Sequence, residues 1–420
     1  MEITYNYYVL SLAMLLGFFG YGQNVHKGYG PPIPPMGKRW VMNPDFSDEF
    51  NGTALDTTKW LDHHPTWIGR KPGLFMASQV TVADGYLQLK GAHMGKDTLV
   101  NAYGKVDTFN IKGAAVVSKK KIQFGYYETR VKAAATTMST TFWFSTVGNF
   151  KGPKDCDSYG LEWDIHESIG RKGDFDGQFF ASGMHANAHF WYNDCEGKRH
   201  DFRAPQVRFE DERLTSEDFN VYGGWWKNES EASLYYNHRP PKHQRFYDKI
   251  KQQPFDQPMY MRLVSETYPY PWIALPNKEE LADSTKNVVY YDWVRAYQLV
   301  PVNQYYANAD LERELKLYQE GIYFNAANIT LTYSPQLKIP MNYKANEKRL
   351  LVVELWNAQD KKLMESSMEV LPGFGHFQFD LYPKMNLKRE ENYRISVKLK
   401  SLTSNDPKVL DYNTIILNLE

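Results

Sequence analysis

The sequence predicts an all-β protein with two domains, a large β-sandwich or barrel followed by a small immunoglobulin-like β-sandwich. Short segments with period-two alternation and many β-branched or aromatic residues recur along the chain, separated by Gly, Asp, Asn and Pro. No helical segment of comparable strength interrupts them before Leu299. Strands in this number are typical of a sandwich or barrel. The length of 420 residues exceeds the size at which one hydrophobic core usually stops growing, which favours two folded units.

The N-terminus has the pattern of a signal peptide. Residues 9–20 form an apolar run of suitable length, and Gly20-Tyr21-Gly22 offers a small-x-small cleavage site. The run is too short to span a bilayer. We therefore expect residues 1–22 to be a signal peptide and the mature protein to be secreted, periplasmic or bound at the cell surface. Because Glu2 precedes the run and no Lys or Arg does, a buried first strand is the alternative.

Residues 23–39 are rich in Pro and Gly and predict an extended tether. The first domain is expected over residues 40–300. Its clearest predicted strands are Gln79–Val82, Tyr86–Leu89, Gly125–Lys132, Thr141–Ser145, Leu161–Ile165 and Val288–Tyr297.

Residues 301–320 differ, because the run LERELKLY has charged and apolar residues at helical spacing and predicts a linker with a short helix. Residues 321–420 alternate again and predict the C-terminal sandwich. Its expected strands include Arg349–Leu355, Gly375–Leu381 and Tyr393–Leu399. The aromatic residues Tyr323, Trp356, Phe374 and Phe377 of this domain either belong to its core or bind carbohydrate.

The charge composition excludes general attraction to polyanions. Lys plus Arg (49) balance Asp plus Glu (49), so no overall field attracts nucleic acid or an anionic membrane. No segment reaches the length of a membrane span, and we expect a soluble monomer. Aromatic residues make up 15% of the chain, which suits both strands and sugar-stacking surfaces.

The two cysteines, Cys156 and Cys195, lie around the most informative segment of the chain. In an exported protein they either form one disulfide or remain two buried thiols. A zinc site is disfavoured, because neither cysteine has a CxxC partner or a His at ligand spacing.

Residues 160–167, GLEWDIHE, contain three acids. On a strand, Glu162 and Asp164 share one face while the apolar residues between them point to the core. In a regular strand Glu167 would point into the core, which an unpaired carboxylate resists. One extra residue at Ile165-His166, a β-bulge, returns it to the face of Glu162. The sequence therefore predicts three acids in a row beside a bulge.

Adjacent acids repel one another, so catalysis explains them better than a solvated strand edge or a calcium site. The α-carbons of Glu162 and Glu167 should lie roughly 13 Å apart, and inward-leaning side chains bring the carboxyls to about 5.5 Å, as in retaining glycosidases. We expect Glu162 to attack the anomeric carbon and Glu167 to protonate the leaving oxygen and then activate water. Asp164 is expected to hydrogen-bond one of them and govern the proton distribution.

With the motif E-x-D-x-x-E, the chain resembles glycoside hydrolase family sixteen in its bulged form. The resemblance implies a jelly-roll β-sandwich, with Glu162 as nucleophile, Asp164 as assisting residue and Glu167 as acid/base. It extends over about residues 40–299, because further segments agree in order. These are Ser47–Gly52 in the opening strand, Phe124–Lys132 in a central strand and Tyr291–Tyr297 in the last strand.

The chain is more similar to the branches that act on red-algal galactans (agarases, porphyranases and carrageenases) than to the β-glucan branches. Residues 139–145, STTFWFS, lack the Trp-Pro-Ala run expected ahead of the aromatic cluster in the latter. The resemblance implies a retaining endo-hydrolase of β-1,4-galactosidic linkages, with β-agarase-like activity favoured. The alternatives are a laminarin-type β-glucan endo-hydrolase, a non-catalytic galactan-binding protein and a transglycosylase.

The expected substrate-binding residues are Trp67, Arg70, Trp143, His185, His189, Trp191 and Glu266. By resemblance, Trp143 stacks under the sugar before the scissile bond, and Trp67 and Trp191 line neighbouring subsites. Arg70 and His185 are candidate donors to hydroxyls or a sulfate, and Glu266 is a candidate acceptor. Each also has a structural interpretation, as a core Trp, a surface Arg, a packed His or a solvated acid.

No cofactor is expected for catalysis. In calcium-binding members of the family, a structural ion is held by a carbonyl of an early Asp-Gly turn and by the Asp that opens the final strand. These positions match Asp84-Gly85 and Asp292. The resemblance thus implies a structural Ca²⁺ site remote from the acids, the alternative being an ordinary turn and a solvated acid.

Overall fold

The computed structural model describes residues 30–102, 104–237, 239–306, 319–383, 387–389, 392–402 and 407–420. The expected signal peptide, the first part of the tether and the run LERELKLY lie outside these residues. The described chain is almost entirely β, as predicted. Its helical elements are α1 (Lys278–Ala282) and the short 3-10 turns η1 (Pro44–Phe46), η2 (Ala77–Gln79) and η3 (Asp176–Ala181). None of the described helices is long and apolar enough to cross a membrane.

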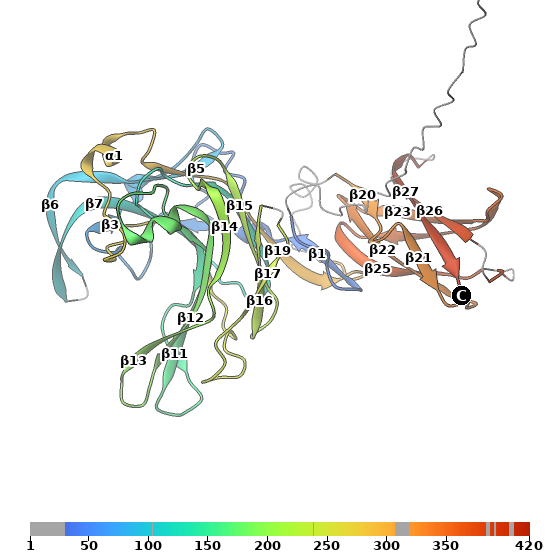
Figure 1. Ribbon diagram of the computed structural model, residues 1–420, viewed down its shortest axis with the longest axis horizontal. Helices are drawn as coiled ribbons and strands as arrows, with labels where there is room; N and C mark the ends of the chain where they lie inside the picture. Colours follow the sequence, from blue (N-terminus) through green and yellow to red (C-terminus); the bar gives the residue numbers. More distant parts are fainter. Residues whose placement is uncertain are drawn as a thin grey trace, which may run out of the picture.

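The first domain is a jelly-roll sandwich of two sheets around one large core (Figure 1). The outer sheet contains β17 (Lys242–Arg245), β16 (Glu231–Tyr236), β15 (Asn220–Trp226), β8 (Gly125–Lys132), β19 (Val288–Pro301), β5 (Tyr86–Lys90) and β4 (Val80–Ala83). The inner sheet has the order β13 (Arg199–Arg203), β12 (Ser182–Asn193), β11 (Ser158–Ser168), β9 (Thr140–Ser145), β18 (Tyr260–Ser265), β7 (Lys105–Ser118) and β2 (Trp60–Leu61). Four further strands pair with members of this sheet: β3 (Gly73–Phe75) and β6 (Ala92–Ala102) with β7, β10 (Phe150–Lys151) with β11, and β14 (Val207–Leu214) with β12.

The outer sheet continues into the C-terminal domain. β1 (Lys38–Met42) pairs with β19 along one edge and with β25 (Gly373–Leu381) along the other, so that Trp40 lies between Leu299 and Phe374. The three strands run side by side between the two lobes in Figure 1. β22 (Leu337–Ala345) and β20 (Gly321–Tyr323) extend the sheet further. Backbone hydrogen bonds therefore join the two domains, in addition to the linker.

The C-terminal domain is a second β-sandwich, closed by a five-stranded sheet packed on β20, β22 and β25. That sheet has the order β21 (Asn328–Leu331), β27 (Val409–Leu419), β26 (Asn392–Lys400), β23 (Arg349–Trp356) and β24 (Lys362–Val370). Phe377 belongs to its core, and Phe374 is buried against Trp40 at the junction. Trp356 is half-buried, with Arg394 Cζ 5.2 Å from its ring centre.

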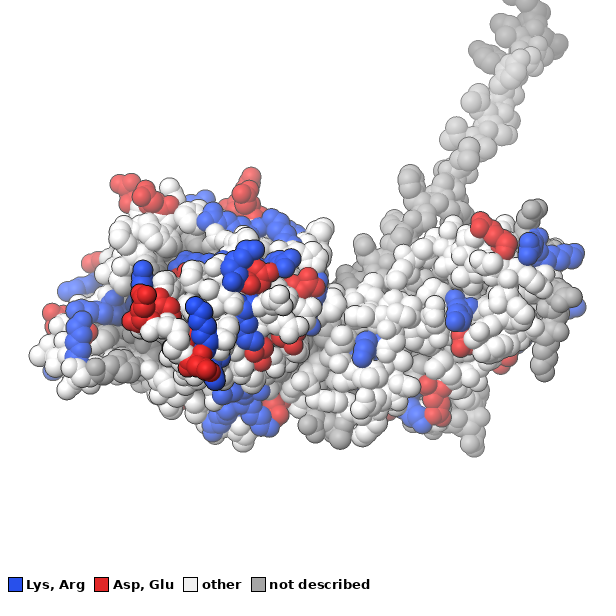
Figure 2. All heavy atoms as spheres, turned by 90° about the horizontal axis from the view of Figure 1, so that it is seen from below, with Lys and Arg blue, Asp and Glu red and all other residues white. Residues whose placement is uncertain are grey.

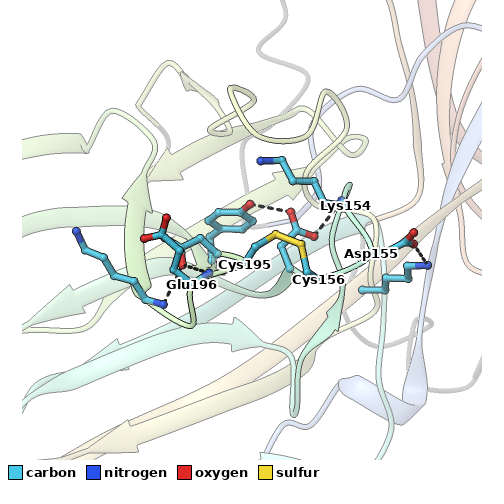
Figure 3. The surroundings of a disulfide bond; sticks show 10 residues. Lys154, Asp155, Cys156, Cys195 and Glu196 are labelled. Carbon is cyan, nitrogen blue, oxygen red and sulfur yellow. Dashed lines mark hydrogen bonds and ion pairs between the residues drawn. A yellow bond between two sulfur atoms is a disulfide. The ribbon is translucent and has the colours of Figure 1, made fainter.

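Cys156 and Cys195 form a disulfide that links the segment before β11 to the turn after β12 (Figure 3). The sequence left open one disulfide or two buried thiols, and the structure shows the disulfide. Figure 2 shows Lys or Arg and Asp or Glu side chains interspersed over the first domain, as the balanced composition leads one to expect.

Candidate active site

The three acids lie on β11, on the face of the inner sheet that points away from the core. Leu161, Trp163 and Ile165 point the other way and are at most 1% exposed. The register of β11 shifts after Asp164 against both neighbouring strands, β9 and β12. The predicted bulge is therefore confirmed, and Glu167 returns to the face of Glu162.

Two adjoining cavities lie over this face, of about 640 Å³ and about 520 Å³. The first covers β9 and is bounded by the β6–β7 hairpin, and the second covers β12, β13 and β14. Arg70, Glu162, Glu167 and Tyr268 line both. The cavities thus form one groove across the strands with the acids in its middle, an arrangement that fits cleavage within a chain.

Six of the seven expected substrate-binding residues line the groove. Trp67, Trp143 and Glu266 line the first half, His189 and Trp191 the second, and Arg70 both. His185 does not. Its Nε2 lies 3.2 Å and 3.1 Å from the carbonyl oxygens of Phe179 and Ser182, and its ring stacks on Phe180. The alternation of β12 places His185 on the face of the groove, but η3 covers this side chain. His185 therefore packs against backbone carbonyls instead of reaching substrate.

Burial and mutual repulsion control the protonation of the acids. Burial, then the charge of Asp164, raises the pKa of Glu162 to about 7. Burial, then Glu167, raises the pKa of Asp164 to about 6. Burial also raises the pKa of Glu167. At neutral pH the cluster therefore carries less than its formal charge, which suits a site needing one ionised and one protonated carboxyl.

His189 stands behind two of the acids. Its Nε2 lies 3.4 Å from Asp164 Oδ2 and 3.9 Å from Glu162 Oε1, and its Nδ1 lies 2.7 Å from Asp201 Oδ1. Burial disfavours its charge, but Asp164 and Asp201 outweigh burial and raise the pKa of His189 to about 10. The ring is thus an imidazolium that stabilises ionised Glu162. The sequence did not single out Asp201.

Glu167 is held by two donors that sequence reasoning also missed. Asn187 Nδ2 donates to Oε2 at 2.6 Å, and the Tyr268 hydroxyl donates to Oε1 at 2.9 Å. Asn187 lies within the run containing His185 and His189, so its alternation with them on β12 was the available signal. Both donors fix the carboxyl in the groove, where it can transfer a proton to a leaving group.

Trp143 is 9% exposed and packs over a buried arginine, Arg262, whose Cζ is 4.8 Å from the ring centre. Arg262 donates to the carbonyl oxygens of Ser145 and Tyr260 at 2.9 Å each. It also donates from Nε to His64 Nε2 at 2.9 Å, because burial and Arg262 lower the pKa of His64 to about 3 and leave that ring neutral. Arg262 thereby orients the tryptophan that faces the groove.

Arg70 forms an ion pair with Glu266, with 2.9 Å between Nε and Oε2, and contacts the Tyr270 hydroxyl. The two predicted binding residues therefore orient one another. Burial raises the pKa of Glu266 to about 7, although Arg70 opposes this.

Among the described residues, the grouping of His, Cys, Asp or Glu that could hold a metal is Glu162, Asp164 and His189, with ligand atoms within 4.8 Å of one another. Asp164 and Asp201 raise the pKa of His189 to about 10, so a metal would have to displace a proton that both carboxylates hold on the ring, and we assign this group to acid chemistry. At the expected calcium site, Gly85 lies in the β4–β5 turn, while Asp292 Oδ2 accepts from Arg130 Nη1 at 2.5 Å. A cation there would compete with that guanidinium, and the calcium site stays a prediction.

Residues 40–299 match the family described as Beta-porphyranase A-D, GH16 domain, and residues 322–412 match the Porphyranase-associated domain. Beta-porphyranase D of Zobellia galactanivorans is 63% identical over 390 residues, which are 93% of this chain and 91% of that protein. The extracellular agarase of Streptomyces coelicolor is 27% identical over 65% of this chain and 88% of its own. The crystal structure of the beta-porphyranase BpGH16B from the human gut bacterium Bacteroides plebeius is similar with a TM-score of 0.59 and 36% identity, covering 65% of this chain and 96% of that one.

Proposed function

The chain belongs to the GH16 domain family of beta-porphyranases A to D and is a glycoside hydrolase, and we propose that it cleaves porphyran within the chain with retention of anomeric configuration. The observation that carries the proposal is the row of Glu162, Asp164 and Glu167 on one face of β11, in the middle of a groove with two open halves. Porphyran, a sulfated galactan, is favoured over agar because the beta-porphyranase is 63% identical and the agarase 27%. The expected preference for agarase activity is not confirmed.

Each step of the reaction has a residue in place. A carboxylate oxygen of Glu162 attacks the anomeric carbon while Glu167 gives its proton to the departing glycosidic oxygen. Water then attacks the glycosyl ester and gives its proton to Glu167, which frees Glu162. Asn187 and Tyr268 hold Glu167, and the His189 imidazolium stabilises the negative charge that returns to Glu162.

The proposal is tested by measuring the release of reducing ends from porphyran, agarose, κ-carrageenan and laminarin. We expect the highest kcat/KM on porphyran. A higher value on agarose would contradict the proposed substrate, and a higher value on laminarin would support the β-glucan alternative. An absence of release from every polysaccharide would support a binding protein without turnover.

We also propose that the protein is exported. The apolar run over residues 9–20 supports this, and so does the disulfide, because such bonds persist in oxidising compartments. Recovery of the protein from the medium or the periplasm of an expressing bacterium, with a shortened N-terminus, is the expected result.

A further inference from the structure

One wall of the groove is a stack of five planar groups, Arg70, Tyr270, Trp272, Phe179 and Arg208. Arg70 Cζ is 5.1 Å from the Tyr270 ring centre. The ring centres of Tyr270 and Trp272 are 5.3 Å apart at 4°, and those of Trp272 and Phe179 are 6.1 Å apart at 11°. Arg208 Cζ is 4.7 Å from the Phe179 ring centre. A guanidinium thus lies at each end of three nearly parallel rings, an arrangement that holds both cations in place.

The two guanidinium groups differ in how their charge is balanced. Arg70 is paired with Glu266 at 2.9 Å. Arg208 is exposed and forms no ion pair with any carboxylate that the structure describes. Its one side-chain hydrogen bond among those residues is from Nε to Gln206 Oε1 at 2.5 Å. Arg208 therefore presents an uncompensated positive charge with N–H groups still able to donate.

Arg208 is aligned with the acid/base residue. On β11 and β12, Glu167 is directly opposite His185, and on β12 and β14, His185 is directly opposite Arg208. These positions form one row across the inner sheet, so Glu167 and Arg208 are two strand spacings, roughly 10 Å, apart. Arg208 lines the half of the groove that lies on the other side of the acids from Trp143. If Trp143 stacks under the sugar before the scissile bond, that half receives the aglycone.

We infer that Arg208 binds a sulfate ester of the galactan on the aglycone side of the cleavage point and selects sulfated over neutral chains there. The inference rests on the proposed function, since porphyran supplies the anion. A guanidinium offers sulfate two parallel hydrogen bonds, and the stack on Phe179 keeps its plane oriented before substrate arrives. A neutral galactan leaves this cation unpaired and gains nothing from it.

The test compares R208Q with the wild-type protein on porphyran and on solvolytically desulfated porphyran. R245Q is the matched control, because Arg245 is an exposed arginine on β17 of the outer sheet, outside the groove. On porphyran, R208Q is expected to raise KM about tenfold with kcat changed less than twofold, the scale of a lost charge-assisted hydrogen bond. On the desulfated chain R208Q and wild type should have equal kcat/KM. R245Q should match wild type on both substrates.

The salt dependence of KM provides a second measurement. The wild-type KM on porphyran should rise with NaCl more steeply than that of R208Q, because one ion pair with substrate is missing in the variant. An equal KM loss on both substrates would show that Arg208 only supports Phe179, and an unchanged KM on porphyran would also overturn the inference. If instead the wild-type protein releases nothing from porphyran while it hydrolyses agarose, the proposed substrate fails and the role of Arg208 fails with it.

Discussion

Asp201 Oδ1 lies 2.7 Å from His189 Nδ1, and this largely buried pair stands directly behind Glu162 and Asp164. Arg203 pairs with the other oxygen of Asp201. The imidazolium is thus supported from the rear by a carboxylate while its Nε2 faces Asp164 and Glu162. The acid pair of this glycoside hydrolase therefore depends on charges contributed by two further strands, β12 and β13.

Replacing Asp201 with Asn is expected to move the acidic limb of the kcat/KM profile to higher pH by roughly one unit. The amide removes one of the two carboxylates, Asp164 and Asp201, that raise the pKa of His189 to about 10, so that pKa falls. Glu162, with a pKa of about 7, then loses part of the positive potential that favours its ionised form. Glu162 must be ionised to attack, so activity is lost as the pH falls through its pKa. D201E keeps the charge and serves as control, and a D201N profile identical to that of the wild type would refute the coupling.

The Asp201–His189 pair should also contribute to the thermal stability of the folded protein, in a way that depends on pH. The pKa of His189 is raised from 6.5 to about 10 in the folded protein. The contribution of the charged His189 to the free energy of unfolding is therefore fully present below about pH 6.5 and is lost as the pH rises through about 10. The difference in Tm between wild type and D201N should be largest below that range and small above it. A difference that grows with pH would contradict this sign.

Glu162→Gln and Glu167→Gln should each lower kcat at least about a hundredfold while leaving Tm and oligosaccharide binding nearly unchanged. Both acids line the groove and neither supports the core between the sheets. Proton nuclear magnetic resonance of the wild-type reaction should show the β-anomer first. An initial α-anomer is incompatible with Glu162 as nucleophile.

Trp143→Ala is expected to affect both binding and stability. The ring lines the groove but is only 9% exposed and packs with Ala115 and Val264. We expect KM to rise about tenfold through lost stacking, together with a lower Tm through lost packing. Trp143→Phe should recover most of the Tm and part of the KM. A folded alanine variant with unchanged KM would rule out stacking on substrate.

Gly373→Ala tests the junction of the two domains. A Cβ there would lie 2.4 Å from the carbonyl oxygen of Trp40, where β1 meets β25, and the residue has φ of +122°. The expected result is a lower Tm and faster proteolysis within residues 301–320. Gly37→Ala is the control, because Gly37 also has positive φ, +77°, but nothing within 4 Å of its Cβ, so backbone strain alone should cost about 1–2 kcal/mol. An equal loss of Tm in both variants would argue against a clash between the new Cβ at position 373 and the carbonyl oxygen of Trp40.

The disulfide should stabilise the protein by about 3–4 kcal/mol, on a chain-entropy model for its sequence separation of 39 residues. A reducing agent is therefore expected to lower the Tm of the wild type, and the Cys156→Ser/Cys195→Ser variant should have that lower Tm with or without the reductant. A wild-type Tm that is indifferent to reduction, with the sulfurs shown to be free, would oppose this contribution.

Much of the protein could be predicted from the sequence because the relevant signals are local. Period-two alternation is a property of each strand by itself, and it identified β8, most of β9 and β19, and the middle of β11. The bulge was predictable for the same reason, since a carboxylate at position 167 could not point into an apolar core. Local patterns and the family resemblance together predicted that the three acids share one face of a strand. They also identified six residues that line the groove, out of the seven expected to bind substrate.

What only the tertiary structure decided involves segments far apart in the chain. Alternation places His185 on the groove face, but the position of η3, with Phe179 and Phe180, determines that its ring is covered. Asp201 acts on His189 because β13 pairs with β12, and β1 joins the domains because it lies between β19 and β25. Strand register and the order of strands in a sheet arise from the packing of the whole core, and a carboxylate or guanidinium has its effect through whatever that packing brings within a few ångströms of it.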